Sequence, residues 1–212
     1  MRSPCAVATE DGGVLCLYAG DDGGRTHLFS AWLPSSGTGL LRSEWQRLGP
    51  TLRAGRPGDA DAAGCDHPSL VRVGRRRWLW YTARDGAGEA RSGRISVASS
   101  VAGEPWARHG VVLGRGAPGQ PDELAAESPA GSLRNPDPDS RTLVELLYTG
   151  VDAHGATRAL RARSTDAVTF DRLGPLTGTG IRDATVADGP EGTRWLAAAE
   201  DGALSVGPLG WS

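Results

Sequence analysis

Three short sequence elements recur in the same order along the chain, and this recurrence constrains the fold more than any other feature. An aromatic-x-Arg-x-Gly element begins at Trp45, Trp106 and Phe170. An apolar run that ends in tyrosine before a small-residue or Thr-Gly turn has copies at Tyr18, Tyr81 and Tyr148. A polar residue just before a proline opens the third element, in Ser3-Pro4, Asp66-His67-Pro68 and Glu127-Ser128-Pro129, with 181–186 as a degenerate fourth copy. Such periodicity predicts a repeat architecture.

The residues between these elements favour strands. The 31 glycines and 14 prolines are spread along the 212 residues rather than gathered in one linker. Short runs rich in β-forming residues, several alternating apolar with polar, lie between turn signals, whereas helical periodicity is almost absent. The sequence therefore predicts an all-β chain.

The spacing predicts a β-propeller of four-stranded antiparallel blades. Twenty-one residues separate Trp45 from Asp66, and the same number separates Trp106 from Glu127. In the second repeat we expect strands at His67–Val73, Arg77–Ala83, Arg94–Ser100 and Trp106–Leu113. Repeats that cannot bury both faces alone stack around an axis as blades. We expect one domain over 1–212, with blades near 3–52, 66–113, 127–176 and 183–212, the last with room for three strands only.

The repeats are compatible with two ways of completing the propeller ring. The chain either closes as about four blades or forms an incomplete five-bladed ring that a partner finishes, and dimerisation is an alternative for its assembly. In both, the first strand of each blade lines the central channel. Ser3, Asp66, Glu127 and Asp183 are then expected to converge at one mouth of that channel.

The combination of Asp-x-Pro, a hairpin ending in Trp-Tyr-Thr, the strand Gly93–Ser100 and Trp-x-Arg-x-Gly resembles the five-bladed propeller glycosidases. That superfamily includes the arabinanase and β-xylosidase family and the invertase and levanase family. In it, three successive blades supply a base or nucleophile Asp, a second Asp that orients substrate or tunes a pKa, and a Glu acid. The resemblance implies that Glu127 is the acid and Asp66 the second-blade Asp.

The first-blade position departs from that pattern, because our alignment places Ser3 there and a hydroxyl cannot act as the carboxylate base. Asp183, next to Arg182, is the candidate replacement, since an adjacent guanidinium favours an ionised carboxylate. His67 is a candidate for binding substrate or orienting Asp66, and Ser3 and Arg182 are further candidates for substrate binding. Asp66 also has a structural interpretation, because Asp-x-Pro often begins a turn.

Such carboxylates suit glycosidic cleavage. One protonated carboxyl acts at the leaving oxygen and one carboxylate acts across the sugar, about 5–5.5 Å apart for retention or about 6.5–9.5 Å for inversion. A shared channel in which the environments differ holds one carboxyl protonated and leaves the other charged. The ligand expected in the channel is therefore a small glycoside or a sugar-like molecule.

Composition excludes several other classes. Twenty-three basic residues, all arginine, nearly balance 25 acids, so a nucleic-acid-binding face is not expected. No apolar run has the ~18 residues of a membrane span, and no signal peptide is visible, so we expect a cytoplasmic protein. Cys5, Cys16 and Cys65 suit neither a zinc site nor a disulfide framework, and whether Cys5 pairs with Cys16 stays open.

No cofactor or metal is expected. Two acidic stretches, Asp59-Ala-Asp61 and 135–139, invite a calcium interpretation, but the first is short and the second lacks the glycine and distal Glu of a calcium loop. Turns explain both better. Trp32, Trp80 and Trp211 lie outside the repeats and are candidates for stacking on a ligand ring.

Three functions follow. The first is a glycosidase-like enzyme with Glu127 as acid and Asp66 or Asp183 as its charged partner. The second is a repurposed biosynthetic enzyme that uses the same acids for proton transfer, elimination or cyclisation of a non-sugar metabolite. The third is a non-catalytic propeller that binds a ligand or a protein. Fold resemblance alone does not choose among them.

Overall fold

The computed structural model describes residues 2–86, 93–101, 104–134, 143–188, 194–200 and 203–208. Within these ranges strands dominate, and the helical element is a single 3-10 turn, η1 (Arg42–Glu44). The all-β prediction is confirmed. The chain forms two compact units, Met1–Gly88 with Ser96–Gly110 and Glu89–Ile95 with Val111–Ser212.

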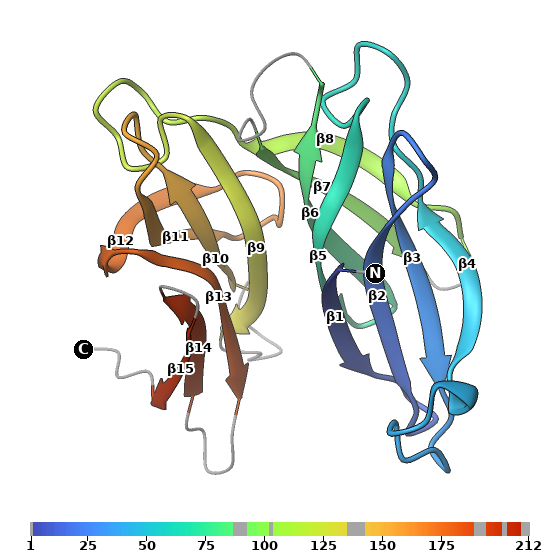
Figure 1. The fold of residues 1–212 in the computed structure, drawn as a ribbon. Coiled ribbons are helices and arrows are strands. Elements are labelled where there is room, and N and C mark those ends of the chain that lie inside the picture. Colours follow the sequence, from blue (N-terminus) through green and yellow to red (C-terminus); the bar gives the residue numbers. More distant parts are fainter. Residues whose placement is uncertain are drawn as a thin grey trace. The chain divides into compact units, whose positions relative to one another are not determined.

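The first sheet is a four-stranded antiparallel meander of β1 (Arg2–Ala8), β2 (Val14–Asp21), β3 (Thr26–Leu33) and β4 (Gln46–Leu52). Figure 1 shows these strands in blue to cyan. Because β2 and β3 pair without a register shift, Leu17 and Ala19 of β2 lie opposite Ser30 and Leu28 of β3, so these four buried residues share one face of the sheet.

The second sheet has the order β5, β6, β7, β8. Its strands are β5 (Gly64–Val73), β6 (Arg76–Arg84), β7 (Arg94–Val101) and β8 (Ala107–Leu113). Each lies within a few residues of its predicted bounds. One parallel pair, Thr26 with Gly64, joins β3 to β5, so that the first two sheets form one continuous eight-stranded sheet.

The second unit contains the last two sheets. The third runs β12, β11, β10, β9, and its strands are β9 (Ala125–Arg134), β10 (Leu143–Val151), β11 (Thr157–Ser164) and β12 (Asp171–Thr179). The fourth has three strands, as its length predicts: β13 (Ile181–Asp188), β14 (Arg194–Glu200) and β15 (Ala203–Pro208). Consecutive strands are antiparallel in both sheets (Figure 1).

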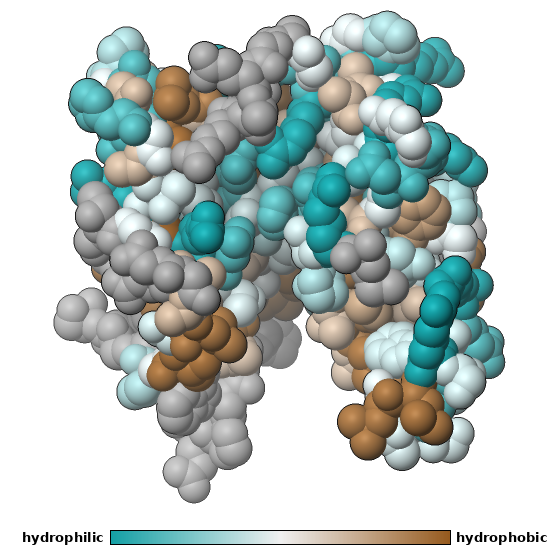
Figure 2. Space-filling model, in the orientation of Figure 1, coloured by the Kyte–Doolittle hydropathy of each residue, from teal (hydrophilic) through white to brown (hydrophobic). Residues whose placement is uncertain are grey.

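Each unit has its own apolar core. In the first unit, Leu17, Leu28, Leu70 and Leu79 pack with Tyr81 and smaller side chains. In the second, Leu147 and Ala159 pack with Ala184 and Ala198, which ties the third sheet to the fourth. The connection between β3 and β4 instead exposes Leu40 and Leu41, and Figure 2 shows a hydrophobic patch at the place of this connection.

The structure has three free cysteines among its described residues, Cys5, Cys16 and Cys65, and burial raises the pKa of each thiol.

Among the described residues, no helix has the length and apolar content needed to cross a membrane. Trp80 is fully buried, and in the described part of the chain it packs beside Trp78. Trp211 and residues 135–139 lie outside the described residues.

Candidate functional site

Every inner strand begins with the same backbone irregularity. In β1, β5, β9 and β13 the register with the next strand shifts by a bulge, and the bulged residue has a positive φ. These residues are Ser3 (50°), His67 (46°), Ser128 (51°) and Asp183 (52°). Left-handed backbone is uncommon for residues other than glycine, and bulges gather beside functional sites because they redirect side chains. The repeated bulge marks the candidate site.

The bulge also fixes which residues are equivalent. The residue before it pairs across the sheet in each case: Arg2 with Ala19, Asp66 with Thr82, Glu127 with Thr149, and Arg182 with Ala199. Arg2 and Arg182 therefore occupy the positions of Asp66 and Glu127. The four equivalent positions carry two arginines and two acids.

This register corrects the sequence alignment. Ser3 and Asp183 were aligned with Asp66 and Glu127, but they are bulge residues, equivalent to His67 and Ser128. The alignment matched Ser3, directly before Pro4, to acids that stand two residues before their prolines, and so selected the bulge residue that lies between the acid position and the proline. The sequence held a usable signal, because Asp66 and Glu127 each stand two residues before a proline, and counting back two from Pro4 gives Arg2.

Asp66 is a buried carboxylate, 5% exposed, in the first unit. Its Oδ2 accepts a hydrogen bond from Arg2 Nε at 3.1 Å, and its Oδ1 accepts one from the backbone N–H of His67 at 2.9 Å. The His67 ring nitrogen Nδ1 lies 3.7 Å from the same Oδ1. Asp66, Arg2 and His67 are thus brought together, and the guanidinium compensates the carboxylate charge.

Arg2 is held by more than Asp66. Its Nη2 donates to Thr26 Oγ1 at 2.8 Å, and its Nη1 lies 3.4 Å from Asp21 Oδ2. Thr26 and Asp21 end the β2–β3 hairpin, so the first sheet fixes the guanidinium while half of the Arg2 side chain faces solvent. Sequence reasoning named neither Arg2 nor these two partners.

Glu127 lies half-buried at the start of β9 in the second unit. Its Oε1 accepts a hydrogen bond from the backbone N–H of Gly93 at 3.3 Å. Thr149, its partner across the sheet, accepts a hydrogen bond at Oγ1 from the backbone N–H of Asp183 at 2.9 Å. The structure therefore gathers Glu127, Thr149 and the start of β13, while the side chains of Arg182 and Asp183 are exposed.

A buried polar clasp positions the strand that carries each acid. Five residues before Asp66, Asp61 Oδ2 accepts hydrogen bonds from Tyr81 Oη at 2.8 Å and Arg108 Nε at 3.1 Å. Five residues before Glu127, Asp122 Oδ2 accepts the same pair from Tyr148 Oη at 3.0 Å and Arg172 Nε at 2.9 Å. We call each set an Asp–Tyr–Arg clasp. It joins the entry loop of a sheet to two of that sheet's own strands.

The entry loops share the pattern Gly-x-Pro-Gly-x-x-Asp, at 55–61 and 116–122. A Cβ at Gly55 or Gly116 would overlap Oδ1 of the clasp aspartate, so only glycine lets the loop close over the carboxylate. Each clasp arginine also donates from Nη2 to a backbone carbonyl eight residues before the aspartate, Arg53 O and Gly114 O. Asp61 thus has a structural role in the clasp. Among the described residues, no group of three or more His, Cys, Asp or Glu side chains could hold a metal ion.

The clasp tyrosines make stability sensitive to alkali. Burial, with the neighbouring aspartate charge, raises the pKa of Tyr81 and Tyr148. Unfolded tyrosines ionise near pH ~10, so above that pH the unfolded chain binds fewer protons and stability falls as pH rises. We expect the urea midpoint, followed by circular dichroism, to be lower at about pH 11 than at about pH 8, and to fall less in Tyr148→Phe. An equal fall of the urea midpoint in Tyr148→Phe and in the parent chain would show that ionisation of Tyr148 does not cause the loss of stability.

Several solved glycoside hydrolase structures are similar in fold to this chain. A family 117 glycoside hydrolase from the marine bacterium Zobellia galactanivorans aligns with 98% of this chain at a TM-score of 0.77 and 17% identity. Fructan 1-exohydrolase IIa from Cichorium intybus aligns with all of it at 0.74 and 17%, and sucrose-6-phosphate hydrolase from Lactobacillus gasseri with 95% at 0.71 and 14%. The chain has the fold of the glycoside hydrolase β-propellers. The expected likeness to the propeller glycosidases is confirmed at the level of fold.

The chain spans 66%, 42% and 40% of the lengths of these three proteins, in the same order. No protein-family profile matches it, and no curated protein does. At 14–17% identity the likeness is one of fold.

Proposed function

We propose that this chain acts on a small glycoside or sugar-like ligand, with Glu127 as the general acid. The observation that carries the proposal is the place of Glu127: half-buried, at the bulged start of an inner strand, in a fold that glycoside hydrolases use. Its Oε1 accepts a hydrogen bond from the Gly93 N–H, which helps to hold the carboxyl group at the start of β9. An acid held on a strand can be aimed at a leaving oxygen without reorganisation.

Asp66 is the charged partner that we favour. Its hydrogen bonds to Arg2 and the His67 N–H fix both carboxylate oxygens, and such a group can stabilise positive charge that develops on a sugar ring. Asp183 is the alternative, because its backbone is tied to Thr149 beside Glu127 while its side chain reaches solvent. Arg182 and His67 are proposed to bind the substrate, and Ser3 contributes through its bulge.

A panel of aryl glycosides tests the proposal, with α-L-arabinofuranoside, β-xyloside and β-fructoside included. We expect the folded chain to release the aryl alcohol from at least one of them. If no glycoside of the panel releases its aryl alcohol, with folding verified by circular dichroism, hydrolysis is overturned as the activity.

Two substitutions separate the candidate partners on the substrate that responds. We expect Asp66→Asn to lower kcat/KM by about 100-fold or more, because a fixed charge next to the reacting centre is lost. Asp183→Asn should remain close to the parent chain. A large loss in Asp183→Asn with little change in Asp66→Asn would transfer the role of charged partner to Asp183.

One observation favours a second candidate function. Arg2, at the first-strand position where the resemblance calls for a base, is a cation that neutralises Asp66. An arginine cannot take a proton from water, since it stays charged at every working pH. This favours a repurposed enzyme that uses Glu127 for proton transfer, elimination or cyclisation of a non-sugar metabolite, or a module that only binds its ligand. The absence of hydrolysis on every glycoside of the panel would favour this second candidate function.

A further inference from the structure

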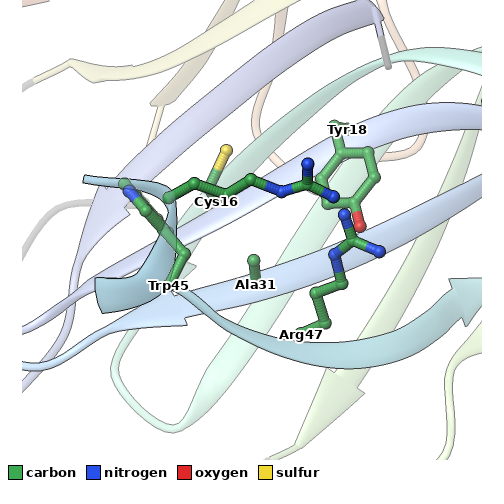
Figure 3. Close-up of a pocket in the computed structure, with 6 residues that line it drawn as sticks. Cys16, Tyr18, Ala31, Trp45 and Arg47 are labelled. Carbon is green, nitrogen blue, oxygen red and sulfur yellow. The ribbon is translucent and has the colours of Figure 1, made fainter. Parts of the chain in front are cut away.

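A cavity of about 590 Å³ opens in the first sheet, apart from the residues proposed for catalysis. It is lined by Cys16, Tyr18, Ala31, Arg42, Trp45 and Arg47. Figure 3 shows Arg47 extending its guanidinium toward the hydroxyl end of Tyr18. Two of the lining residues are cations and none is an acid, so the cavity suits an anionic group on a partly apolar body.

Tyr18 and Arg47 are the first-sheet copies of the clasp residues. Tyr18 precedes the residue paired with Arg2, as Tyr81 and Tyr148 precede the partners of Asp66 and Glu127. Arg47 stands in the same aromatic-x-Arg-x-Gly element as Arg108 and Arg172. The glycine that ends this element has nearly the same φ in each copy, 88°, 86° and 89° at Gly49, Gly110 and Gly174. Two of the three clasp groups are therefore present in the first sheet.

The third group, a carboxylate, has no counterpart among the described residues. Within the described ranges the Tyr18 hydroxyl and the Arg47 guanidinium make no hydrogen bond or ion pair, although the Tyr18 ring stacks on Phe29. The donors that hold Asp61 and Asp122 elsewhere thus face a cavity here.

We propose that the Tyr18–Arg47 cavity binds a carboxylate, which accepts hydrogen bonds from Tyr18 Oη and Arg47 Nε as the clasp aspartates do. A charge-assisted pair of this kind is strong and directional. The carboxylate is carried either by an aspartate on a Gly-x-Pro-Gly-x-x-Asp segment or by a small organic acid that rests on the Trp45 and Tyr18 rings. The two sources share one chemistry, and a binding experiment separates them.

The probes are a capped peptide with the sequence of residues 53–63 and, separately, benzoate. Binding is followed by the NMR signals of the Trp45 indole N–H and the Arg47 Nε–H. We expect a probe to shift both signals, and the shift to weaken about tenfold or more when the aspartate equivalent to Asp61 in the peptide is asparagine, or when benzamide replaces benzoate. A peptide with asparagine at the Asp59 position is the matched control and should bind like the parent peptide.

The protein variants complete the test. Arg47→Leu should lose the binding, Tyr18→Phe should weaken it, and Arg115→Leu, which changes an exposed arginine outside the cavity, should leave it unchanged. Binding of the peptide alone assigns the site to a polypeptide segment, and binding of benzoate alone assigns it to a small acid. The proposal is overturned if neither probe shifts the signals, or if Arg47→Leu binds as the parent chain does.

Discussion

The Asp122→Asn variant should lose about 3 kcal/mol of unfolding free energy. The Asp122 side chain is 1% exposed and accepts hydrogen bonds from Arg172 and Tyr148. An asparagine keeps the shape, and its carbonyl oxygen can still accept from Tyr148 and Arg172, but the arginine loses its counter-charge. Removing one charge of a buried pair in this way costs about 3–5 kcal/mol. We place the loss at the lower end because the Arg172 side chain is 38% exposed and water can solvate it in part.

Urea unfolding followed by circular dichroism measures this loss. Asp171→Asn is the matched control in the same unit, because Asp171 is 78% exposed and lies 3.9 Å from Arg163, a surface pair worth at most about 1 kcal/mol. Asp61→Asn should resemble Asp122→Asn, since it opens the equivalent clasp of the first unit. Equal losses in Asp122→Asn and Asp171→Asn would show that the clasp contributes no more than a surface pair.

The second large effect is expected for Glu127→Gln. If Glu127 protonates the leaving oxygen, the amide removes general acid catalysis and lowers kcat/KM by about 10²–10⁴-fold. The loss depends on the substrate. A methyl glycoside needs the proton and should show the full loss, whereas a 4-nitrophenyl glycoside releases a stable phenolate and should show much less.

Kinetics on that pair of substrates, which share one sugar, separate the acid from a residue that merely supports the fold. Glu10→Gln is the control, since the Glu10 side chain is 78% exposed and pairs with Arg72 at the surface. An equal loss of kcat/KM on both substrates would contradict the acid role, because it would mean that protonation of the leaving group is not the step affected.

The strands could be predicted closely because turn signals and alternation are local properties of the sequence. The four strands expected around the Asp66 and Trp106 elements lie within a few residues of β5 to β8. The role of the clasp could not be predicted in the same way. Tyr81 and Arg108 were recognisable only as members of repeated elements, because their partner Asp61 lies in an entry loop and meets them only after the sheet forms.

The site was predicted in part. Asp66 and Glu127 could be selected as candidates because each opens a repeated element two residues before a proline and matches an acid position of the propeller glycosidases. Arg2 was missed because Ser3, directly before Pro4, was matched to acids that stand two residues before their prolines, and because the ion pair with Asp66 joins residues 64 apart in the chain. The convergence of Asp66 with Glu127, the single domain over 1–212 and the catalytic roles stay predictions.

The bulge at the start of each inner strand keeps the same backbone conformation although the residues at and before it differ between the four sheets. Serine, histidine, serine and aspartate occupy the same left-handed position in the four sheets, and arginine, aspartate, glutamate and arginine precede them without altering the pairing of the strand. Each sheet thus carries a different polar side chain at one equivalent backbone position. Exchanging these residues is expected to change the chemistry at the strand starts while the clasps and cores are left intact.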